Sequence, residues 1–456
     1  MSRRRVAIIG AGPSGLFTAQ ALLAKDPELA IDVFDRLPTP YGLLRYGVAP
    51  DHTAIKRVAE TLARVFESRA VRFVGMVELG RDITRDWLRD SYDAVIYALG
   101  ASRDAHLGVP GEQLAGSMSA REFVAWYGGH PDAVPIELRG VRTAMVIGVG
   151  NVAIDVARIL ARPVEDLSRT DIPDPVLDEL DRWPVPEIWM VGRRGPRQTS
   201  FTPVELRELL TLDGVEVSIQ GCAPEELSDD PELDRRTRAV VEALRAAAER
   251  KVDEPRVRLH LLFWHRVWRV EGAGQVEAVR LEATRTDLRG RLEGYEQWLD
   301  LPVELLLRAV GYRGQQLPGL PFDSVSGTIA NRSGRVVDER GTVQPGEYVV
   351  GWIKRGAVGV IGTNKSDAVE TVAALWDDLD SSAAATTEKD PVAELAAAGK
   401  PVADFATWLR IDAAEVARGE EQGRIRTKIA TWTELAGLVA DDAPRAAGSD
   451  AEQAGA

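Results

Sequence analysis

Cysteine is almost absent from this chain of 456 residues, in which Cys222 is the only one. A single cysteine excludes an internal disulfide, a redox-active cysteine pair and an iron–sulfur cluster held by cysteines of this chain. Histidine is also scarce, and the five histidines lack the close spacing of a metal site, so we expect no metal centre. They are His52, His106, His130, His260 and His265.

Long hydrophobic runs are missing as well. No stretch of about 18 apolar residues occurs, so we expect no transmembrane helix. The basic start is followed by only four apolar residues, which is too short for a secretion signal. Positive charge is in the minority, and the net charge of −14 argues against nucleic acid or anionic membranes as the main partner. We therefore expect a cytoplasmic protein, of about two or three domains.

What the sequence does contain is a glycine turn that occurs twice. Each copy consists of a short apolar run typical of a buried strand, then the glycines, then an apolar helical stretch. The turn residues are Gly10, Gly12 and Gly15 in the first copy, and Gly148, Gly150 and Ala153 in the second. Two such units predict two dinucleotide-binding α/β folds, each built on a parallel sheet.

The first turn is followed by a carboxylate at the position that binds ribose in such folds. Gly10 permits the tight turn, Gly12 lets a pyrophosphate approach the backbone, and Gly15 lets the helix pack closely on the strand. Asp35 ends the next strand, twenty residues after Gly15, where it can accept hydrogen bonds from ribose hydroxyls. The first unit is therefore expected to bind a dinucleotide.

The second turn is followed by arginines instead of a carboxylate. The strand-like run at residues 188–191 leads into Arg193 and Arg194. A guanidinium binds a phosphate through two hydrogen bonds, whereas a carboxylate repels it, so this pair favours the 2′-phosphate of NADP(H) over NAD(H). A solvated arginine pair at a strand end is the other interpretation.

One unit with a ribose carboxylate and one with arginines together predict a flavoprotein that binds FAD and NADPH. A hydride would pass from the nicotinamide to the flavin, and the protein would orient the two cofactors. A further glycine-rich run, Gly359 to Gly362, precedes a helical stretch at residues 366–375. Its amide groups would face the polar edge of the flavin and stabilise the reduced, anionic form.

Several longer segments resemble one family of flavoproteins. They are residues 37–52, 150–160, 191–196, 201–209 and 350–365. In these segments the chain is similar to adrenodoxin reductase and its bacterial ferredoxin–NADP reductase relatives. The similarity runs from about residue 5 to residue 372 and weakens beyond it.

The resemblance implies two Rossmann-like dinucleotide-binding domains, with the NADP domain inserted into the FAD domain. The expected bounds are residues 1–105 and 312–379 for the FAD domain and residues 106–311 for the NADP domain. The rest of the chain is interpreted as a linker at 380–396, a helical C-terminal extension at 397–440 and a disordered tail at 441–456.

The same resemblance implies which residues form the site. Those expected to contact FAD, besides the first glycine turn, are Ser14, Asp35, Leu43, Val77, Trp352, Gly359, Val360 and Ile361. Those expected to contact NADP are Gly148, Val149, Gly150, Asn151, Val152, Arg193, Arg194, Glu205 and, at the nicotinamide end, Gly359. His52 and Glu208 would lie near the two rings as catalytic or positioning residues. A structural loop histidine and a solvated helix face are the alternatives for these two.

The implied electron acceptor is an iron–sulfur ferredoxin, reduced one electron at a time and able to feed a cytochrome P450. Ferredoxins are usually acidic, so the docking face is expected to be basic although the whole chain is acidic. Arg197 and Arg207, near the expected NADP site, are the candidates. The nearby arginines at 235, 236 and 238 are more typical of a solvated helix face. The resemblance also favours a monomer.

Two other functions stay open. An NADPH-dependent flavin monooxygenase also carries two glycine turns, although segments like residues 38–52 and 352–365 are not typical of it. A non-catalytic NADPH/FAD-binding sensor is the alternative from a different class. A disulfide reductase is excluded by the single cysteine, and the small subunit of glutamate synthase by the lack of a cysteine-rich cluster domain.

Overall fold

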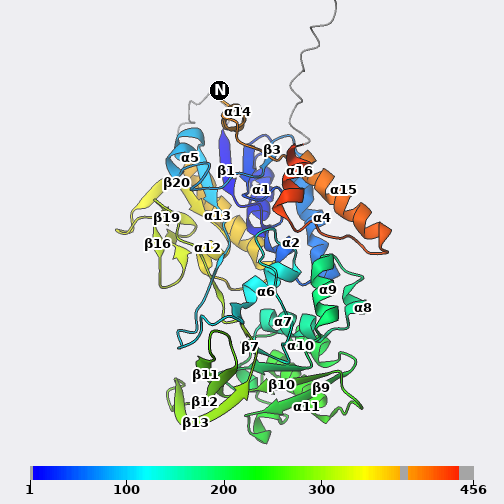
Figure 1. The fold of residues 1–456 in the computed structure, drawn as a ribbon. Coiled ribbons are helices and arrows are strands. Elements are labelled where there is room, and N and C mark those ends of the chain that lie inside the picture. The colour runs from blue at the N-terminus through cyan, green and yellow to red at the C-terminus, as the bar shows by residue number, and fades with distance from the viewer. Residues whose placement is uncertain (1–3, 381–388, 441–456) are drawn as a thin grey trace, which may run out of the picture.

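The structure, a computed structural model, describes residues 4–380 and 389–440. Two sheets organise it, one in the upper and one in the lower half of Figure 1. The tail at 441–456, expected to be disordered, lies outside the described residues. Among the residues that are described, no helix is both long and apolar enough to cross a membrane.

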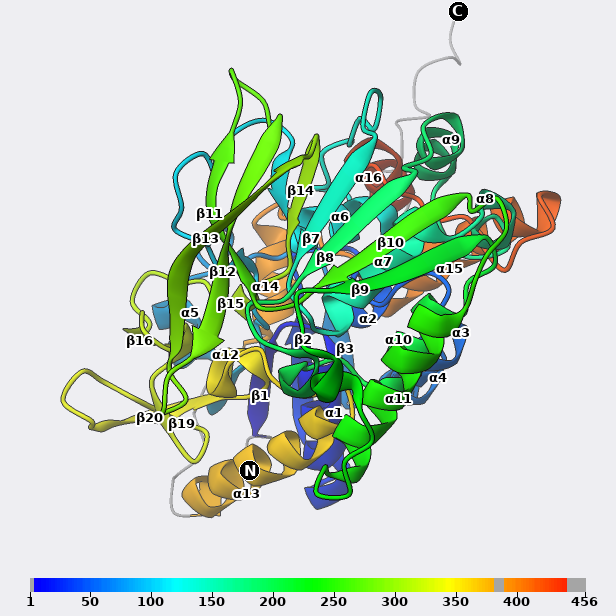
Figure 2. The same cartoon turned by 90° about the horizontal axis from the view of Figure 1, so that it is seen from below.

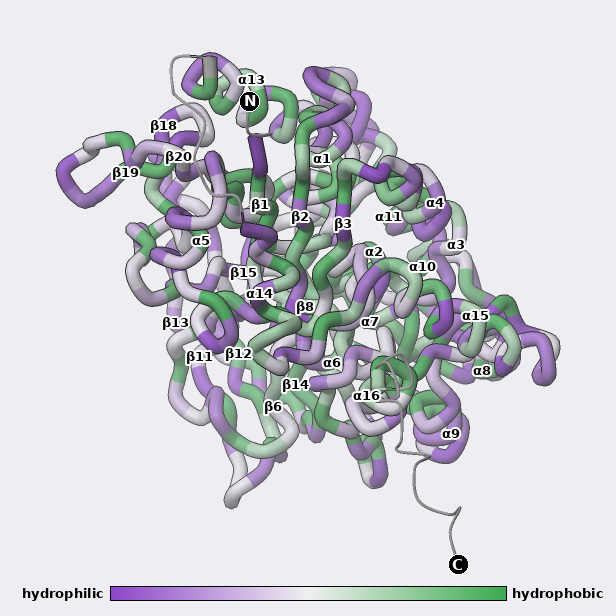
Figure 3. The backbone as a smooth tube through the Cα atoms, turned by 90° about the horizontal axis from the view of Figure 1, so that it is seen from above, coloured by the Kyte–Doolittle hydropathy of each residue, from purple (hydrophilic) through white to green (hydrophobic). Residues whose placement is uncertain are grey.

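The first sheet has seven strands in the order β18-β19-β20-β4-β1-β2-β3. Their bounds are β1 (Arg5–Ile9), β2 (Ala30–Phe34), β3 (Val71–Val74), β4 (Ala94–Tyr97), β18 (Asn331–Arg332), β19 (Arg335–Val337) and β20 (Val343–Val349). The strands β20, β4, β1, β2 and β3 pair in parallel, and β18 and β19 add an antiparallel edge. Figure 3 shows hydrophobic segments along the inner strands and a more hydrophilic outer hairpin at β18 and β19.

The second sheet has six parallel strands in the order β6-β14-β7-β8-β10-β9, and the last five of them are seen side by side in Figure 2. Their bounds are β6 (Ser117–Ser119), β7 (Thr143–Ile147), β8 (Glu187–Val191), β9 (Val215–Gln220), β10 (Val257–Leu262) and β14 (Leu305–Arg308). Helices cover one face, and the other packs on an antiparallel sheet of β11 (His265–Glu271), β12 (Ala278–Thr286) and β13 (Leu292–Pro302).

The second sheet is inserted into the first, because every one of its strands lies between β4 and β18 in the chain. The two segments that cross between the sheets pair with each other as β5 (Arg103–Asp104) and β15 (Tyr312–Arg313). Two more short strands, β16 (Phe322–Asp323) and β17 (Thr328–Ile329), form a hairpin after the return. The predicted α/β class, with one dinucleotide fold inserted into another, is confirmed.

Helices fill the layers beside the sheets, and α1 packs along α13 behind the first sheet. The helices of the first sheet are α1 (Pro13–Lys25), α2 (Leu43–Tyr46), α3 (Thr53–Lys56), α4 (Val58–Ala63), α5 (Arg85–Ser91), α12 (Trp352–Arg355) and α13 (Thr363–Asp380). Those of the inserted part are α6 (Ala120–Tyr127), α7 (Asn151–Ala161), α8 (Val164–Leu167), α9 (Asp174–Arg182), α10 (Pro203–Leu210) and α11 (Arg235–Glu249).

The C-terminal part differs from the expected linker followed by one helical extension. Helix α14 (Pro391–Ala397) occupies most of the second half of the region taken as a linker. It forms because Asp390 caps its first turn through the amide of Val392 and also binds the guanidinium of Arg72 at 2.6 Å. The extension itself consists of α15 (Phe405–Glu421) and α16 (Trp432–Ala440).

The first glycine turn is dictated by close backbone contacts. Gly10 has φ +115°, and a Cβ there would lie 2.4 Å from the carbonyl oxygen of Ala98. A Cβ on Gly15 would lie 2.0 Å from the carbonyl oxygen of Gly10, which shows how closely α1 packs on β1. At Gly12 the nearest atom is the Cα of Gly42, at 4.0 Å. Gly10 and Gly15 are therefore required by the fold, whereas Gly12 is not.

Replacing Gly15 by alanine is expected to destabilise the protein, because the added methyl group forces α1 away from β1. Overpacking of this kind costs about 2 kcal/mol or more, to be read from the free energy of unfolding in urea. Gly12→Ala is the matched control, and it loses only a favourable N-cap residue, about 0.5–1 kcal/mol. Equal losses in the two variants would contradict this description of the turn.

Candidate active site

A cavity of about 1950 Å³ is lined by residues of both dinucleotide folds. From the first fold it receives the turn after β1, the end of β2 and the loop before α13. From the second it receives residues of α6, the loop at residues 130–141, the start of α7 and one residue of α10. The two folds therefore face one shared space.

Almost all residues expected to contact FAD line this cavity. They are Gly10, Gly12, Ser14, Asp35, Leu43, Val77, Trp352, Gly359, Val360 and Ile361. Gly15 does not line it, because it packs α1 on β1. The apolar side chains of Leu43 and Val360 are 41% and 64% exposed, so they offer free apolar surface to a ligand in the cavity.

The start of α1 presents free backbone amides to the cavity. Gly12 is the N-cap residue of this helix, and no side chain caps the first turn. Gly12 also faces Gly42 across the cavity wall, and neither has a side chain that would block a ligand. An anion placed there gains the amides and the positive end of the helix dipole.

Asp35 lies at the end of β2 with its carboxylate on the cavity. It accepts hydrogen bonds from the amides of Ala11 at 2.9 Å and Leu37 at 3.0 Å, which fix its orientation. Burial raises the pKa of Asp35, and the two amides oppose that shift. Each carboxylate oxygen keeps a lone pair that can accept a hydroxyl proton.

The second glycine turn organises the start of α10. Gly148 has φ +132° and packs on the carbonyl of Ala309. The carbonyl of Val149 accepts the amide of Ser200 at 2.9 Å, and Oδ1 of Asn151 accepts the amide of Thr202 at 2.8 Å. The turn thereby determines where the glutamates of α10 lie.

Only part of the expected NADP set lines the cavity, namely Asn151, Val152, Glu205 and Gly359. Gly148, Val149 and Gly150 do not line it, and neither do Arg193 and Arg194, which follow β8. Both arginines are exposed, and within the described part of the chain neither side chain forms a hydrogen bond or ion pair. Their guanidinium groups are thus free to bind an added anion.

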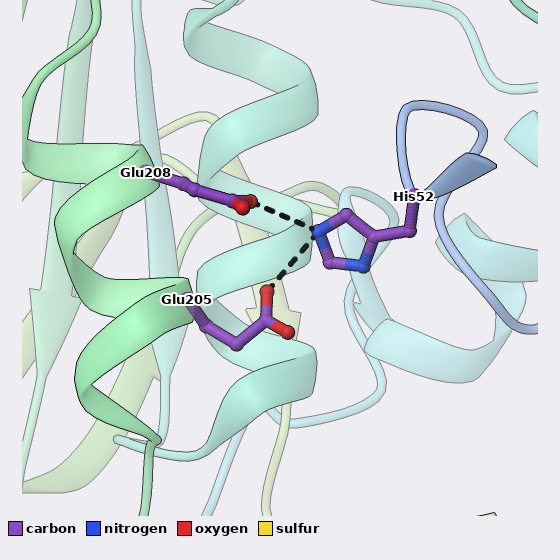
Figure 4. Close-up of side chains that lie close together, drawn as sticks. All are labelled: His52, Glu205 and Glu208. Atoms are coloured by element: carbon purple, nitrogen blue, oxygen red, sulfur yellow. Dashed lines mark hydrogen bonds and ion pairs between the residues drawn. The ribbon is translucent and has the colours of Figure 1, made fainter. Parts of the chain in front are cut away.

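His52 meets two glutamates of α10, as Figure 4 shows. Its Nε2 lies 3.1 Å from Oε2 of Glu205 and 3.2 Å from Oε2 of Glu208. His52 precedes α3 of the first fold, and the glutamates belong to the second. The structure therefore brings together the two residues expected to be catalytic, at the junction of the folds.

The proton on His52 decides which neighbour it binds. Burial lowers the pKa of His52, but the hydrogen bond to Glu205 and the charge of Asp155 outweigh burial, so the pKa lies above its usual value. The Nη2 atom of Arg158 lies 2.6 Å from the same nitrogen. Nε2 donates to the glutamates when protonated and accepts from Arg158 when it is not.

A buried arginine on α7, not anticipated from the sequence, holds this cluster together. The side chain of Arg158 is fully buried and binds Asp51 at 2.7 Å and Asp155 at 2.8 Å. Burial raises the pKa of Asp155 to about 6, in spite of Arg158. Charged residues three apart in an otherwise apolar helix were the available signal, since such charges are buried only when paired.

Tyr312 was also missed. Its ring stacks on Trp352 with a centroid distance of 5.9 Å, and both residues line the cavity. Tyr312 belongs to the returning segment β15 and Trp352 to α12, so the contact joins parts of the chain about 40 residues apart. Nothing in the sequence near Tyr312 indicates this pairing.

The histidine spacing gave no sign of a metal site, yet His52, Glu205 and Glu208 place three possible ligand atoms within 4.8 Å of one another. The guanidinium of Arg158 already lies beside Nε2 of the histidine. Its positive charge opposes a metal ion at this position. The cluster is therefore interpreted as an ion-pair network.

The two arginines proposed for docking differ in their surroundings. Arg197 binds Asp230 at 2.9 Å and the carbonyl of Glu225 at 2.7 Å, so its guanidinium is occupied by the protein itself. Arg207 is exposed, and its side chain forms no ion pair within residues 4–380 and 389–440. In the run that follows, Arg236 and Arg238 bind backbone carbonyls, as a structural helix face does.

Comparison with known proteins agrees with this architecture. Residues 4–182 match the family described as pyridine nucleotide-disulphide oxidoreductase. NADPH-ferredoxin reductase FprA of Mycobacterium tuberculosis is 42% identical over 451 residues, which cover 94% of this chain and 98% of that protein. Mitochondrial NADPH:adrenodoxin oxidoreductase of Arabidopsis thaliana is 37% identical over 462 residues, covering 96% and 95%.

A solved structure gives the same result for the fold. Mycobacterium tuberculosis FprA in complex with NADPH superposes with a TM-score of 0.89 at 40% sequence identity, covering 96% of this chain and 99% of that one. Similarity of this extent spans both dinucleotide folds and most of the C-terminal part. The chain belongs to the family of NADPH-ferredoxin reductases and adrenodoxin reductases.

Proposed function

We propose that this protein is an NADPH:ferredoxin oxidoreductase, which takes a hydride from NADPH onto bound FAD and passes single electrons to an iron–sulfur ferredoxin. The observation that carries the proposal is the single cavity lined by both dinucleotide folds. The names of the relatives, NADPH-ferredoxin reductase and NADPH:adrenodoxin oxidoreductase, support the same reaction. FAD supplies the conversion of a two-electron donor into single electrons.

The first fold fits FAD. The free amides at the start of α1 would hold the pyrophosphate, and the carboxylate of Asp35 would accept the ribose hydroxyls. Leu43 and Val360 would cover the apolar parts of the ring system. The loop at Gly359 has φ +91°, which leaves its backbone free to approach the cofactor.

The second fold fits NADPH. Arg193 and Arg194 would bind the 2′-phosphate, since both guanidinium groups are exposed at the end of β8. The start of α7, beginning at Asn151, would face the pyrophosphate. The nicotinamide would then enter the shared cavity beside Glu205, where it could approach the flavin.

His52 is proposed to position the nicotinamide side of the cavity. Its contacts with Glu205 and Glu208 fix α10 of the NADP domain against a loop of the FAD domain. Hydride transfer itself requires no protein acid, so the histidine acts by holding these elements and one proton at Nε2. Glu208 is half-exposed and supports the histidine from the solvent side.

Arg207, rather than Arg197, is proposed as the docking residue for the acidic ferredoxin, because of these two arginines only Arg207 has a free guanidinium.

The domain bounds at residues 105–106 and 311–312 are supported by the β5–β15 pair, where the two crossing segments meet. The monomeric state, the cytoplasmic location and delivery to a cytochrome P450 remain predictions from the sequence. The tests below also distinguish this function from that of a flavin monooxygenase and from that of a non-catalytic NADPH/FAD-binding sensor.

The proposal predicts that cytochrome c reduction by NADPH rises steeply and saturates with added ferredoxin. Arg207→Glu should raise the KM for ferredoxin about 10-fold and flatten the dependence of the rate on salt. Arg289→Glu is the matched control, since it makes the same charge change on the exposed β12–β13 turn. A rate indifferent to every ferredoxin, with oxygenated product, would favour the monooxygenase.

Arg193 and Arg194 are expected to determine the choice of NADPH. Each charged hydrogen bond to the 2′-phosphate is worth about 1.5–3 kcal/mol, so Arg193→Leu or Arg194→Leu should lower kcat/KM for NADPH about 10- to 100-fold. The value for NADH, which lacks that phosphate, should stay the same. If both values fell equally, the arginines would serve the fold and not the phosphate.

His52→Ala is expected to slow reduction of the bound flavin by NADPH about 10-fold, because α10 loses its contact with the first fold. The pKa of His52 is raised in the folded protein, so its ion pair is complete below the unfolded pKa of about 6.5 and is lost as pH rises through the higher folded value. The variant should therefore lose more stability at about pH 6 than at about pH 9. Unchanged flavin reduction would remove His52 from the site.

A further inference from the structure

The segment between α15 and α16, together with the first residue of α16, contacts both dinucleotide folds and is here named the C-terminal strap (residues 422–432). Its central side chain, Lys428, is buried. Nζ donates to the carbonyl of Arg45 at 2.8 Å and to that of Gly128 at 2.9 Å, and lies 3.1 Å from Oδ2 of Asp171. Arg45 lies on α2 of the first fold, whereas Gly128 and Asp171 lie in the inserted part.

The strap is fixed firmly to the first fold. Glu415 of α15 is fully buried and binds Arg45 through both carboxylate oxygens. The same carboxylate accepts the amide of Ile429 at 2.9 Å. The guanidinium of Arg45 lies 4.9 Å from the ring centroids of both Tyr46 and Trp408. Packing and hydrogen bonds thus hold the strap against α2, which also carries the cavity residue Leu43.

Further contacts tie the strap to the inserted part. Arg424 binds Asp174 at the start of α9 at 2.7 Å, and Gln422 binds the same carboxylate at 3.1 Å. Trp432 donates to Asp132 at 2.6 Å. In Figure 1 the loop that joins α15 to α16 passes above α9, in agreement with these contacts. The strap therefore spans the junction of the folds.

Such a tie has a physical purpose, because two domains joined by short segments are expected to move relative to each other. The covalent connection consists of the two crossing segments that pair as β5 and β15. The ammonium group of Lys428 donates hydrogen bonds to one backbone carbonyl of each fold. Removing it leaves buried carbonyls without this donor, which is costly enough to loosen the junction.

We propose that the C-terminal strap is an interdomain clasp in which Lys428 is a positioning residue: it fixes the orientation of the NADP domain on the FAD domain, and so the approach of nicotinamide to flavin. The inference rests on the proposed function for its kinetic consequence but not for the clasp itself. Neither Lys428 nor Arg424 lines the cavity, so both would act through domain orientation.

The orientation of the domains can be measured without any reaction. In a Cys222→Ser background, spin labels at Arg69→Cys and Glu242→Cys report the distance between the folds, since both positions are exposed and lie on different domains. Electron–electron double resonance should give a narrow distance distribution for the parent. Lys428→Met should broaden or shift it. An unchanged distribution in the folded Lys428→Met protein would overturn the clasp.

The kinetic consequence is tested on the holoenzyme. Lys428→Met should keep its FAD and should slow flavin reduction by NADPH about 10-fold or more, with a larger deuterium isotope effect when NADPH carries the label at the transferred position. A parent enzyme that does not reduce its flavin with NADPH would refute the proposed function, yet the distance measurement would still decide the clasp.

Arg418→Ala is the matched control, because Arg418 pairs with Glu434 inside the extension at 2.9 Å and contributes nothing across the junction. It should leave both the distance distribution and flavin reduction unchanged. If Lys428→Met does not fold, Arg424→Gln decides, since it removes only the ion pair of Arg424 with Asp174 and should broaden the distribution in the same direction. Equal broadening by Arg418→Ala and by either strap variant would refute a specific clasp.

Discussion

The structure depends above all on the buried guanidinium of Arg158. This positive charge is buried between the two folds. Burial of a charge is costly, and here the cost is offset because Asp51 from the first fold and Asp155 from the same helix pair with the guanidinium. Removal of both aspartates would leave the buried guanidinium without its two hydrogen-bonded carboxylates, and removal of Asp51 alone would break its ion pair with the first fold. The loop carrying His52 is therefore held against α7, and the cavity between the folds keeps a defined width.

Several ion pairs join the dinucleotide folds, among them those of Lys56 with Asp171 and of Arg36 with Asp132, and two groups of interactions stand out. The Arg158 network lies beside the shared cavity, where His52 reaches the glutamates of α10. The C-terminal strap, with Lys428 at its centre, lies on the outer side of α2. A hydride crosses only between rings held a few ångströms apart in the right orientation, so the relative placement of the folds matters as much as either half-site.

Local motifs were well predicted from the sequence, and long-range partners were not. Gly10, Gly15 and Asp35 have roles set by a strand, a turn and a helix within one stretch of chain, so their spacing was enough to place them. The pairing of Arg158 with Asp51 joins residues 107 apart and could not be inferred from spacing. Arg197 was a docking candidate because it is basic and near the expected NADP site, and its bond to Asp230, which joins residues 33 apart, could not be inferred from the sequence. Helix α14 escaped notice because its Asp390 cap is stabilised by the distant Arg72.

The most direct test of the central claim is anaerobic mixing of the purified protein with NADPH, and separately with NADH, while the absorbance of the bound flavin is followed. We expect a yellow protein whose flavin is bleached in one turnover by NADPH and far more slowly by NADH at the same low concentration. A protein that carries no flavin, or a flavin that NADPH does not reduce, would contradict this claim.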